Sequence, residues 1–135
     1  ITFFAGHYNK TTHTLQYVNA GHNHPILVNS TSTIFLNKGS IGLGMLEEIP
    51  KIEISKIKLK EDTILVCYTD GLVELENSNG IAFETDNLMK VVKNNFGKKM
   101  NELDQIIFSK LEEFKGSQDL MDDTAVLSCK FIVSS

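Results

Sequence analysis

Residues 62–74 read Asp-Thr-Ile-Leu-Val-Cys-Tyr-Thr-Asp-Gly-Leu-Val-Glu, and the rest of the fold is built around this stretch. In an extended strand, alternate side chains point to opposite faces. Both faces of this strand would be largely apolar, with Ile64, Val66 and Tyr68 on one side and Leu65, Cys67 and Thr69 on the other. A strand that is apolar on both faces lies in the middle of a sheet. We therefore predict a central strand that ends at Asp70-Gly71.

The end of this strand is the first candidate for chemistry. A carboxylate at the end of a rigid, covered strand is held in place by the core beneath it, as metal ligands and catalytic acids are. The glycine after Asp70 lets the backbone turn sharply and approach a ligand closely. Asp-Gly is also a common turn dipeptide, so the rest of the chain has to decide between a site and a turn.

The composition describes an ordinary globular protein. The chain has 135 residues, of which 41% are hydrophobic and 22% charged, so we expect one domain over residues 1–135. A net charge of -4, with few and scattered basic residues, argues against nucleic acid or an anionic membrane as the main partner. No apolar run is long enough for membrane insertion. Cys67 and Cys129 lie in apolar strand patterns, which predicts buried reduced thiols and a cytoplasmic compartment.

The half of the chain before residue 62 predicts an antiparallel sheet. Alternating apolar residues, separated by polar or glycine-containing turns, predict strands over residues 1–8, 13–20, 26–28 and 33–36. Residues 39–45, Gly-Ser-Ile-Gly-Leu-Gly-Met, superficially resemble a phosphate-binding loop but lack its strand, helix and lysine, so we expect a flexible flap. The apolar phase shifts between Ile54 and Ile57, which predicts a β-bulge near Ser55-Lys56.

The half of the chain after Asp70 predicts two helices. A short extended piece should follow Asp70, after which the apolar period changes to that of a helix. Thr85 or Asp86 would cap a first helix that closes at Gly97, and a second helix would run from Asn101 to Gly116. We expect these helices to form a hairpin that lies on a sheet.

The last strand is predicted over residues 124–133. Alternation assigns its more apolar residues to the buried face and leaves Ser128 and Lys130 on a more polar one. The residues expected to be buried are Ala125, Leu127, Cys129, Phe131 and Val133.

Acidic residues follow the end of the predicted central strand and precede the start of the predicted final strand. If the central and final strands are antiparallel neighbours, Asp70 lies close to Asp122-Asp123. Clustered carboxylates repel one another unless a cation lies between them, and oxygen ligands suit Mg²⁺ or Mn²⁺ better than zinc. A divalent-metal site is therefore one interpretation, and a solvated acidic loop that also contains Asp119 is the other.

Two histidines near a predicted bend are further candidates. His22 and His24 stand two residues apart, before Pro25, and either could add a metal ligand. A histidine near a bend is equally explained as a hydrogen-bonded turn residue. The sequence supports neither a Ser-His-Asp arrangement nor a zinc motif.

Four segments together resemble a known family. They are Tyr-Val-Asn-Ala-Gly-His-Asn-His-Pro at residues 17–25, Ile-Gly-Leu-Gly at 41–44, Tyr-Thr-Asp-Gly-Leu-Val-Glu at 68–74, and Asp122-Asp123 before a closing strand. In this order and spacing they are similar to the bacterial sporulation-protein-E and sigma-factor-regulator branch of the metal-dependent protein phosphatases. That branch belongs to the protein phosphatase 2C-like (PPM) family, and the resemblance covers nearly the whole chain.

The resemblance implies a fold and a metal site. The family fold is an α+β antiparallel β-sandwich with helices outside it and two Mn²⁺ or Mg²⁺ ions at one end. The resemblance assigns Asp70, after the Tyr-Thr strand, and Asp122, in the closing motif, as metal-binding and catalytic aspartates, and Gly71 as a further residue of the metal site. Asp123 is the neighbouring candidate, because Thr124-Ala125 departs from the usual pattern and leaves the direct ligand open. His22 lies where distant relatives place an acid near an accessory metal.

The implied reaction is hydrolysis of phosphoserine or phosphothreonine on a regulatory protein, typically an anti-sigma-factor antagonist. Two cations fit this reaction because they activate water, neutralise phosphoryl charge and align the reacting groups. The alternative is a catalytically silent phosphatase-like module that binds a partner or dimerises. A structural domain with an incidental acidic loop is a third interpretation.

The resemblance also implies what this sequence lacks. In the family, the first metal-binding acid lies in an Asp-rich, Gly-His-Gly-containing segment upstream of these motifs, and residues 1–135 contain no such segment. We therefore expect the C-terminal portion of a catalytic domain, N-terminally incomplete, with an incomplete metal site and negligible activity alone. Uncovered sheet edges would favour a homodimer of this piece.

Overall fold

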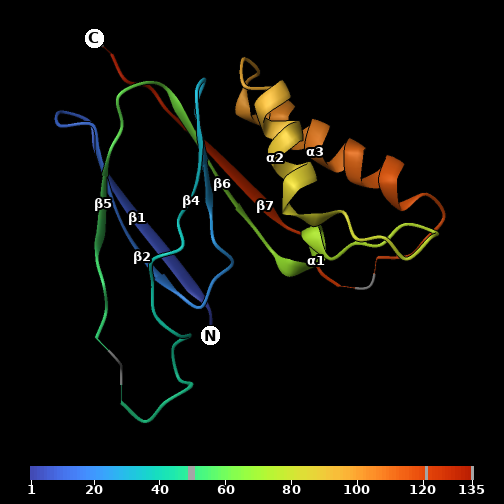
Figure 1. Cartoon of the computed structure of the whole chain (residues 1–135), viewed down its shortest axis with the longest axis horizontal. Helices are drawn as coiled ribbons and strands as arrows, with labels where there is room; N and C mark the ends of the chain where they lie inside the picture. The colour runs from blue at the N-terminus through green and yellow to red at the C-terminus, as the bar shows by residue number, and fades with distance from the viewer. Residues whose placement is uncertain (49–50, 121, 135) are drawn as a thin grey trace.

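The computed structural model describes residues 1–48, 51–120 and 122–134. They form two antiparallel sheets, one with the strand order β1-β2-β5 and one with the order β4-β3-β6-β7. Figure 1 shows the two sheets side by side, with the helices beyond the four-stranded one. The strands are β1 Phe3–Asn9, β2 Thr14–Ala20, β3 Ile26–Val28, β4 Thr33–Phe35, β5 Ser55–Lys58, β6 Thr63–Tyr68 and β7 Val126–Phe131.

Strand β6 is central, as predicted. It lies between β3 and β7 and is covered on both faces. Ile64 and Val66 face a core on the helix side, whereas Leu65 packs with Leu15 and Leu27 between the two sheets. The predicted hairpin of β1 and β2 and the short strands β3 and β4 are also confirmed.

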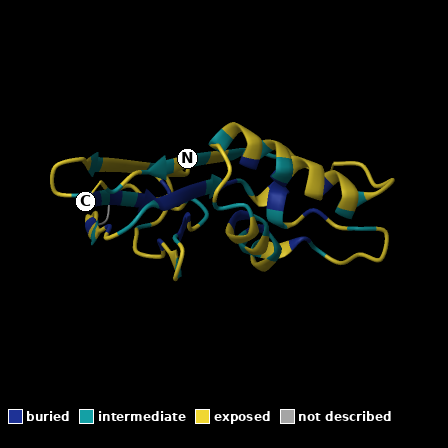
Figure 2. Cartoon of the chain, turned by 90° about the horizontal axis from the view of Figure 1, so that it is seen from above, coloured by how far each residue is buried: buried dark blue, intermediate teal, exposed yellow. Residues whose placement is uncertain are grey.

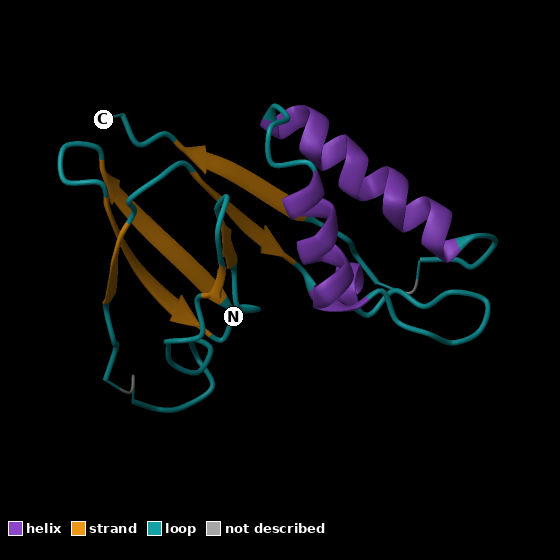
Figure 3. Ribbon diagram, turned by 45° about the horizontal axis from the view of Figure 1, so that its top comes forward, coloured by secondary structure: helices purple, strands orange, loops and turns teal. Residues whose placement is uncertain are grey.

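Three helices follow β6: α1 Asp70–Val73, α2 Glu84–Asn94 and α3 Met100–Lys115. Helices α2 and α3 contact each other and cover the outer face of the four-stranded sheet (Figure 3). Their fully buried residues are Leu88, Val92, Leu103 and Ile107. This arrangement confirms the predicted α+β fold, an antiparallel β-sandwich with an outer helical hairpin.

Two local predictions about chain geometry were wrong. The β-bulge is not formed, because β5 begins at Ser55 in continuous register with β2, and Ile52 and Ile54 lie exposed outside the strand. The piece after Asp70 is helix α1 rather than extended, because this turn buries Leu72.

The predicted cap of α2 was also wrong, since neither Thr85 nor Asp86 caps this helix. It begins at Glu84 and has Phe83 as its N-cap residue, without a side-chain cap hydrogen bond. Phe83 is buried and its backbone N–H donates to the Leu75 carbonyl, so tertiary packing sets the start of the helix. The helix ends at Asn94, and Gly97 follows in the next turn.

The face assignment of the last strand was only partly correct: Phe131 and Val133 pack against the inter-sheet core as predicted, but Ala125, Leu127 and Cys129 do not. Leu127 is 65% exposed and Cys129 is exposed, whereas Ser128 and Lys130 face the helices. Ser128 Oγ donates to Asp104 Oδ1 at 2.6 Å, and Lys130 Nζ lies 4.7 Å from the centre of the Phe96 ring. The reason is position: among the described residues β7 is an edge strand, and the three-stranded sheet covers its inner face only at Phe131, which packs on Tyr8.

The cysteine prediction holds for the chemistry but not for the burial. Cys67 and Cys129 are both free thiols. Cys67 is only partly buried, and Cys129, in β7, is exposed. Among the described residues, no helix is both long and apolar enough to cross a membrane.

Candidate metal centre

The structure brings Asp70 and Asp122-Asp123 to the same end of the sheet. The β6–β7 ladder ends at the pair Tyr68 and Val126, so one strand leaves the sheet beside the point where the other enters it. Gly71 lies directly against the acidic pair: a Cβ built on Gly71 would stand 2.5 Å from the backbone oxygen of Asp123. The absence of a side chain at this glycine therefore permits the close approach of the two acidic segments.

Thr69 joins the two segments through hydrogen bonds. Its hydroxyl donates to the Asp123 carbonyl at 3.1 Å and accepts from the Ala125 N–H at 2.9 Å. Its backbone N–H donates to the Ala125 carbonyl at 3.1 Å. From the sequence, Thr69 could be assigned only to a strand face, because nothing in a single sequence shows which backbone groups its hydroxyl meets.

The carboxylates themselves face water. Asp70, Asp122 and Asp123 lie outside the buried core, and one Asp122 carboxylate oxygen accepts a hydrogen bond from the Asp123 N–H at 2.7 Å. Beneath them, burial raises the pKa of the Tyr68 phenol; the Thr85 hydroxyl opposes this shift and the Asp70 charge adds to it. The Tyr68 hydroxyl donates to the His24 carbonyl at 3.2 Å, which ties this strand end to the bend after β2.

The predicted histidine lies at this end of the sandwich, in a hydrogen-bonded turn. His22 Nδ1 lies 2.8 Å from the Asn23 carbonyl, so this nitrogen carries a proton and donates it. His22 lines a groove of about 260 Å³ together with Thr69 and Ala125. It is therefore near the acidic segments.

Asn19 is a structural residue that local sequence patterns did not reveal. It is 3% exposed, its amide donates to the His22 carbonyl at 3.0 Å, and its side-chain oxygen accepts from the His22 N–H at 2.9 Å. Gly21 follows with φ +71°, and a Cβ built on it would stand 2.6 Å from the Gly42 backbone nitrogen, so the turn and the predicted flap interlock. The one feature of the sequence that could have indicated this turn is an asparagine two residues before a glycine.

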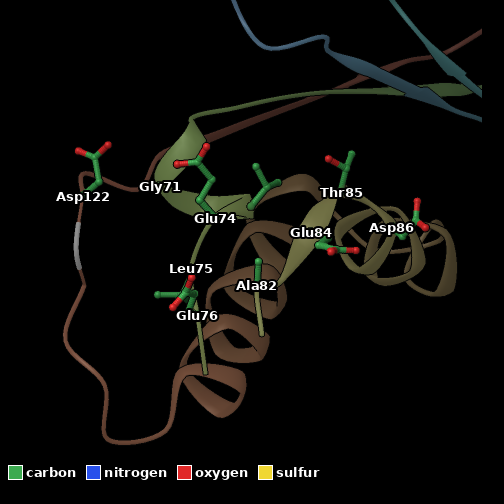
Figure 4. A pocket seen from close by; sticks show the side chains of 10 residues that line it. Gly71, Glu74, Leu75, Glu76, Ala82, Glu84, Thr85, Asp86 and Asp122 are labelled. Atoms are coloured by element: carbon green, nitrogen blue, oxygen red, sulfur yellow. The ribbon is translucent and has the colours of Figure 1, made fainter. Parts of the chain in front are cut away.

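An acidic pocket of about 800 Å³ lies next to the site (Figure 4). Gly71 and Asp122 form part of its wall, and Val73, Leu75 and Ala82 supply apolar lining. In Figure 4, Asp122 lies at one side of the pocket and Asp86 at the other. The remaining acidic lining residues are Glu74, Glu76 and Glu84.

The residues present fit a hard divalent cation in donor type but not in number. Carboxylate and carbonyl oxygens are the ligands that Mg²⁺ and Mn²⁺ prefer, and each ion takes about six of them. Within residues 1–48, 51–120 and 122–134, no group of three or more His, Cys, Asp or Glu side chains is placed to hold a metal ion. A complete site would require donors beyond Asp70 and Asp122-Asp123.

Comparisons with known proteins agree with the fold. The SiaA PP2C domain of Pseudomonas aeruginosa superposes with a TM-score of 0.74 at 18% identity, covering 89% of this chain and 47% of that one. The Mn-presoaked phosphatase domain of the cell fate determinant SpoIIE from Bacillus subtilis superposes with a TM-score of 0.75 at 12% identity. The superposition covers 100% of this chain and 58% of the SpoIIE domain. The structure of the RsbU and RsbW domains of Rv1364c from Mycobacterium tuberculosis superposes with a TM-score of 0.71 at 23% identity. That superposition covers 99% of this chain and 37% of the Rv1364c chain.

These identities establish the fold alone, and the chain spans 37% to 58% of the length of those three structures. No curated protein sequence matched the chain. The sequence profile of Stage II sporulation protein E (SpoIIE), however, matches residues 1–132. That match covers all four motifs and both acidic segments, so the chain belongs to the Stage II sporulation protein E family of PP2C-like phosphatase domains.

Proposed function

We propose that this chain is the C-terminal portion of a metal-dependent protein phosphatase domain that hydrolyses phosphoserine or phosphothreonine on a regulatory protein. Family membership supports the phosphatase assignment. The observation that carries the proposal is the contact of Gly71 with the Asp122-Asp123 backbone, which places two acidic segments at one end of a rigid sheet.

In this proposal Asp70 and Asp122 are the metal-binding and catalytic carboxylates. Asp123 and the Gly71 carbonyl are neighbouring donors, and His22 is an accessory one. Mn²⁺ or Mg²⁺, when bound, supplies an activated water and neutralises phosphoryl charge. The chain's own contribution is to hold these oxygens toward solvent, above the buried residues of β6 and α1.

The substrate proposed is a phosphorylated anti-sigma-factor antagonist in the cytoplasm, with no role for nucleic acid. Activity belongs to the full-length parent, because the described residues offer too few donors for two ions. Taken alone, this portion would be inactive and would dimerise through the edge strands β1 and β7, each of which pairs with one strand only among the described residues.

One observation favours a second candidate, a catalytically silent module that binds a partner. The small donor set among the described residues is also what a domain without turnover would show. The two candidates differ in one respect, which is phosphatase activity of the full-length parent with Mn²⁺.

The test is hydrolysis of a chromogenic phosphate ester by the full-length parent in Mn²⁺. We expect Asp70→Asn to lower kcat by at least about a hundredfold, because a lost metal ligand removes electrostatic stabilisation of the transition state. Asp119→Asn is the matched control: it removes the same charge from an exposed residue outside the site, and activity should persist. Full activity of Asp70→Asn would refute the assignment, and no activity with any divalent metal would favour the silent module.

A further inference from the structure

The end of the β6–β7 ladder poses a geometric problem. Beyond the pair Tyr68 and Val126, one backbone hydrogen bond follows, from the Thr69 N–H to the Ala125 carbonyl, and each strand then leads into an acidic segment. An exposed strand end normally frays, since its backbone groups have lost their ladder partners. Carboxylates that share cations must nevertheless stay within a narrow range of separations.

Thr69 replaces the missing ladder contacts with its side chain. A hydroxyl has one donor and two acceptor sites, and this one donates to Asp123 and accepts from Ala125. With its backbone N–H also bonded to Ala125, a single residue makes three hydrogen bonds across the gap. An aliphatic side chain at this position would leave the Ala125 N–H and the Asp123 carbonyl without these partners.

The same carbonyl controls the approach of α1. The Asp123 oxygen, which accepts from the Thr69 hydroxyl, is also the atom nearest to a Cβ position on Gly71, at 2.5 Å. Movement of this carbonyl therefore changes the distance between the start of α1 and the acidic pair. Asp70 is the first residue of α1 and directly follows Thr69, the N-cap residue, so it stands beside this contact.

We propose that Thr69 is a positioning residue whose hydroxyl sets the separation between Asp70 and Asp122-Asp123 for cation binding. This inference rests on the proposed function. Thr69 does not itself touch the cation; it acts on the backbone that carries the ligands. Residues that orient metal ligands in this way typically contribute about 10-fold to 100-fold to metal affinity.

The test compares Thr69→Val with Thr69→Ser in the full-length parent, with Mn²⁺ affinity measured by calorimetry at a temperature where every variant is folded. Valine keeps the shape of threonine and loses the hydroxyl, so we expect the Kd for Mn²⁺ to rise about 10-fold to 100-fold. Serine keeps the hydroxyl and should restore the Kd to within about threefold of the wild type. Amide hydrogen exchange gives an independent readout: protection of the Ala125 N–H should fall in Thr69→Val and persist in Thr69→Ser.

Thr124→Val is the matched control. The Thr124 hydroxyl makes only a long 3.4 Å contact with the Asp122 carbonyl, so its removal should leave the Kd unchanged. An unchanged Kd in Thr69→Val, with binding abolished by Asp70→Asn, would overturn the positioning role and leave the proposed function intact. Equal losses in Thr69→Ser and Thr69→Val would also overturn it, because they would trace the effect to packing. Absence of Mn²⁺ binding by the wild-type parent would overturn the proposed function itself.

Discussion

The two faces of β6 are covered to different degrees. On the helix side, Ile64 and Val66 pack in one core with Leu88, Leu103 and Ile107, and all five are 0% exposed. On the inter-sheet side the core is smaller, and along β7 the side chains of Leu127 and Cys129 remain exposed. Figure 2 shows buried residues along the middle of the sheet and exposed residues on the outer turns of the helices.

The difference reflects where the covering segments come from. Helices α2 and α3 follow β6 in the chain and precede β7, so one continuous stretch covers the helix side. The sandwich interior instead needs strands from two sheets, and the three-stranded sheet packs on β7 only at Phe131, where the Tyr8 ring lies 4.5 Å away, and leaves Leu127 and Cys129 exposed. The candidate metal centre thus stands on a well-packed base, next to a side of the sandwich that is open.

The largest difference in stability should appear when a leucine is replaced by alanine on the helix side and on the open side of the four-stranded sheet. Leu88→Ala on the helix side should lower the free energy of unfolding by about 2–5 kcal/mol, because it leaves a cavity in a closed core. Leu127→Ala on the open side should change it by less than about 0.5 kcal/mol. Urea denaturation of both variants measures the contrast, and similar losses would show that β7 is covered in solution.

A smaller effect is expected at the contact between α1 and the acidic pair. Gly71→Ala should cost about 1–3 kcal/mol, because its Cβ would stand 2.5 Å from a backbone oxygen that must shift. Gly97→Ala is the control, since nothing lies within 4 Å of a Cβ at that position. Thermal unfolding of the two variants compares them. Equal stability would mean that the close packing at Gly71 is absent in solution.

The smallest effect concerns the thiol at the edge of the inter-sheet core. Burial, with a contribution from Cys129, raises the pKa of Cys67 from 9.0 to about 11. The folded state therefore holds this proton more tightly than the unfolded state, so the stability contribution is complete below pH 9.0 and declines as the pH rises toward 11. Denaturation between about pH 8 and about 10.5 should show a steeper decline in wild type than in Cys67→Ala. In Cys129→Ala, the decline of the unfolding free energy with pH should stay closer to that of the wild type. Identical declines in wild type and Cys67→Ala would contradict the raised pKa of Cys67.

Much of the candidate site was predictable because its elements are local. The strand through Tyr68 was visible from its apolar pattern, and the position of Asp70 at its end followed from Asp-Gly. The pairing with Asp122-Asp123 required only that neighbouring strands be antiparallel, which they are. The metal-ligand roles came from family resemblance and stay predictions.

The contacts of Thr69, Asn19 and Gly71 were not predictable from local patterns. Each depends on a backbone group brought close by the fold: residues 54 or 56 positions away for Thr69, and the Asp123 carbonyl for Gly71. Asn19 meets His22 nearby in sequence, but its burial depends on the close approach of the segment that contains Gly39. Hydrogen bonds and close approaches of this kind leave no periodic trace in a sequence.

Local patterns were enough to specify the antiparallel strands, the helical hairpin and the apolar character of β6, because alternation and helical spacing are direct consequences of side-chain geometry. The buried face of β7 was settled by packing in three dimensions, since Leu127 and Ser128 differ in burial through their neighbours rather than their hydrophobicity. Packing also settled where α2 begins, because burial of Phe83 prevailed over the capping preference of Thr85 and Asp86. Contacts with distant segments outweigh local preference at these positions because a buried side chain contributes more free energy than a helix cap.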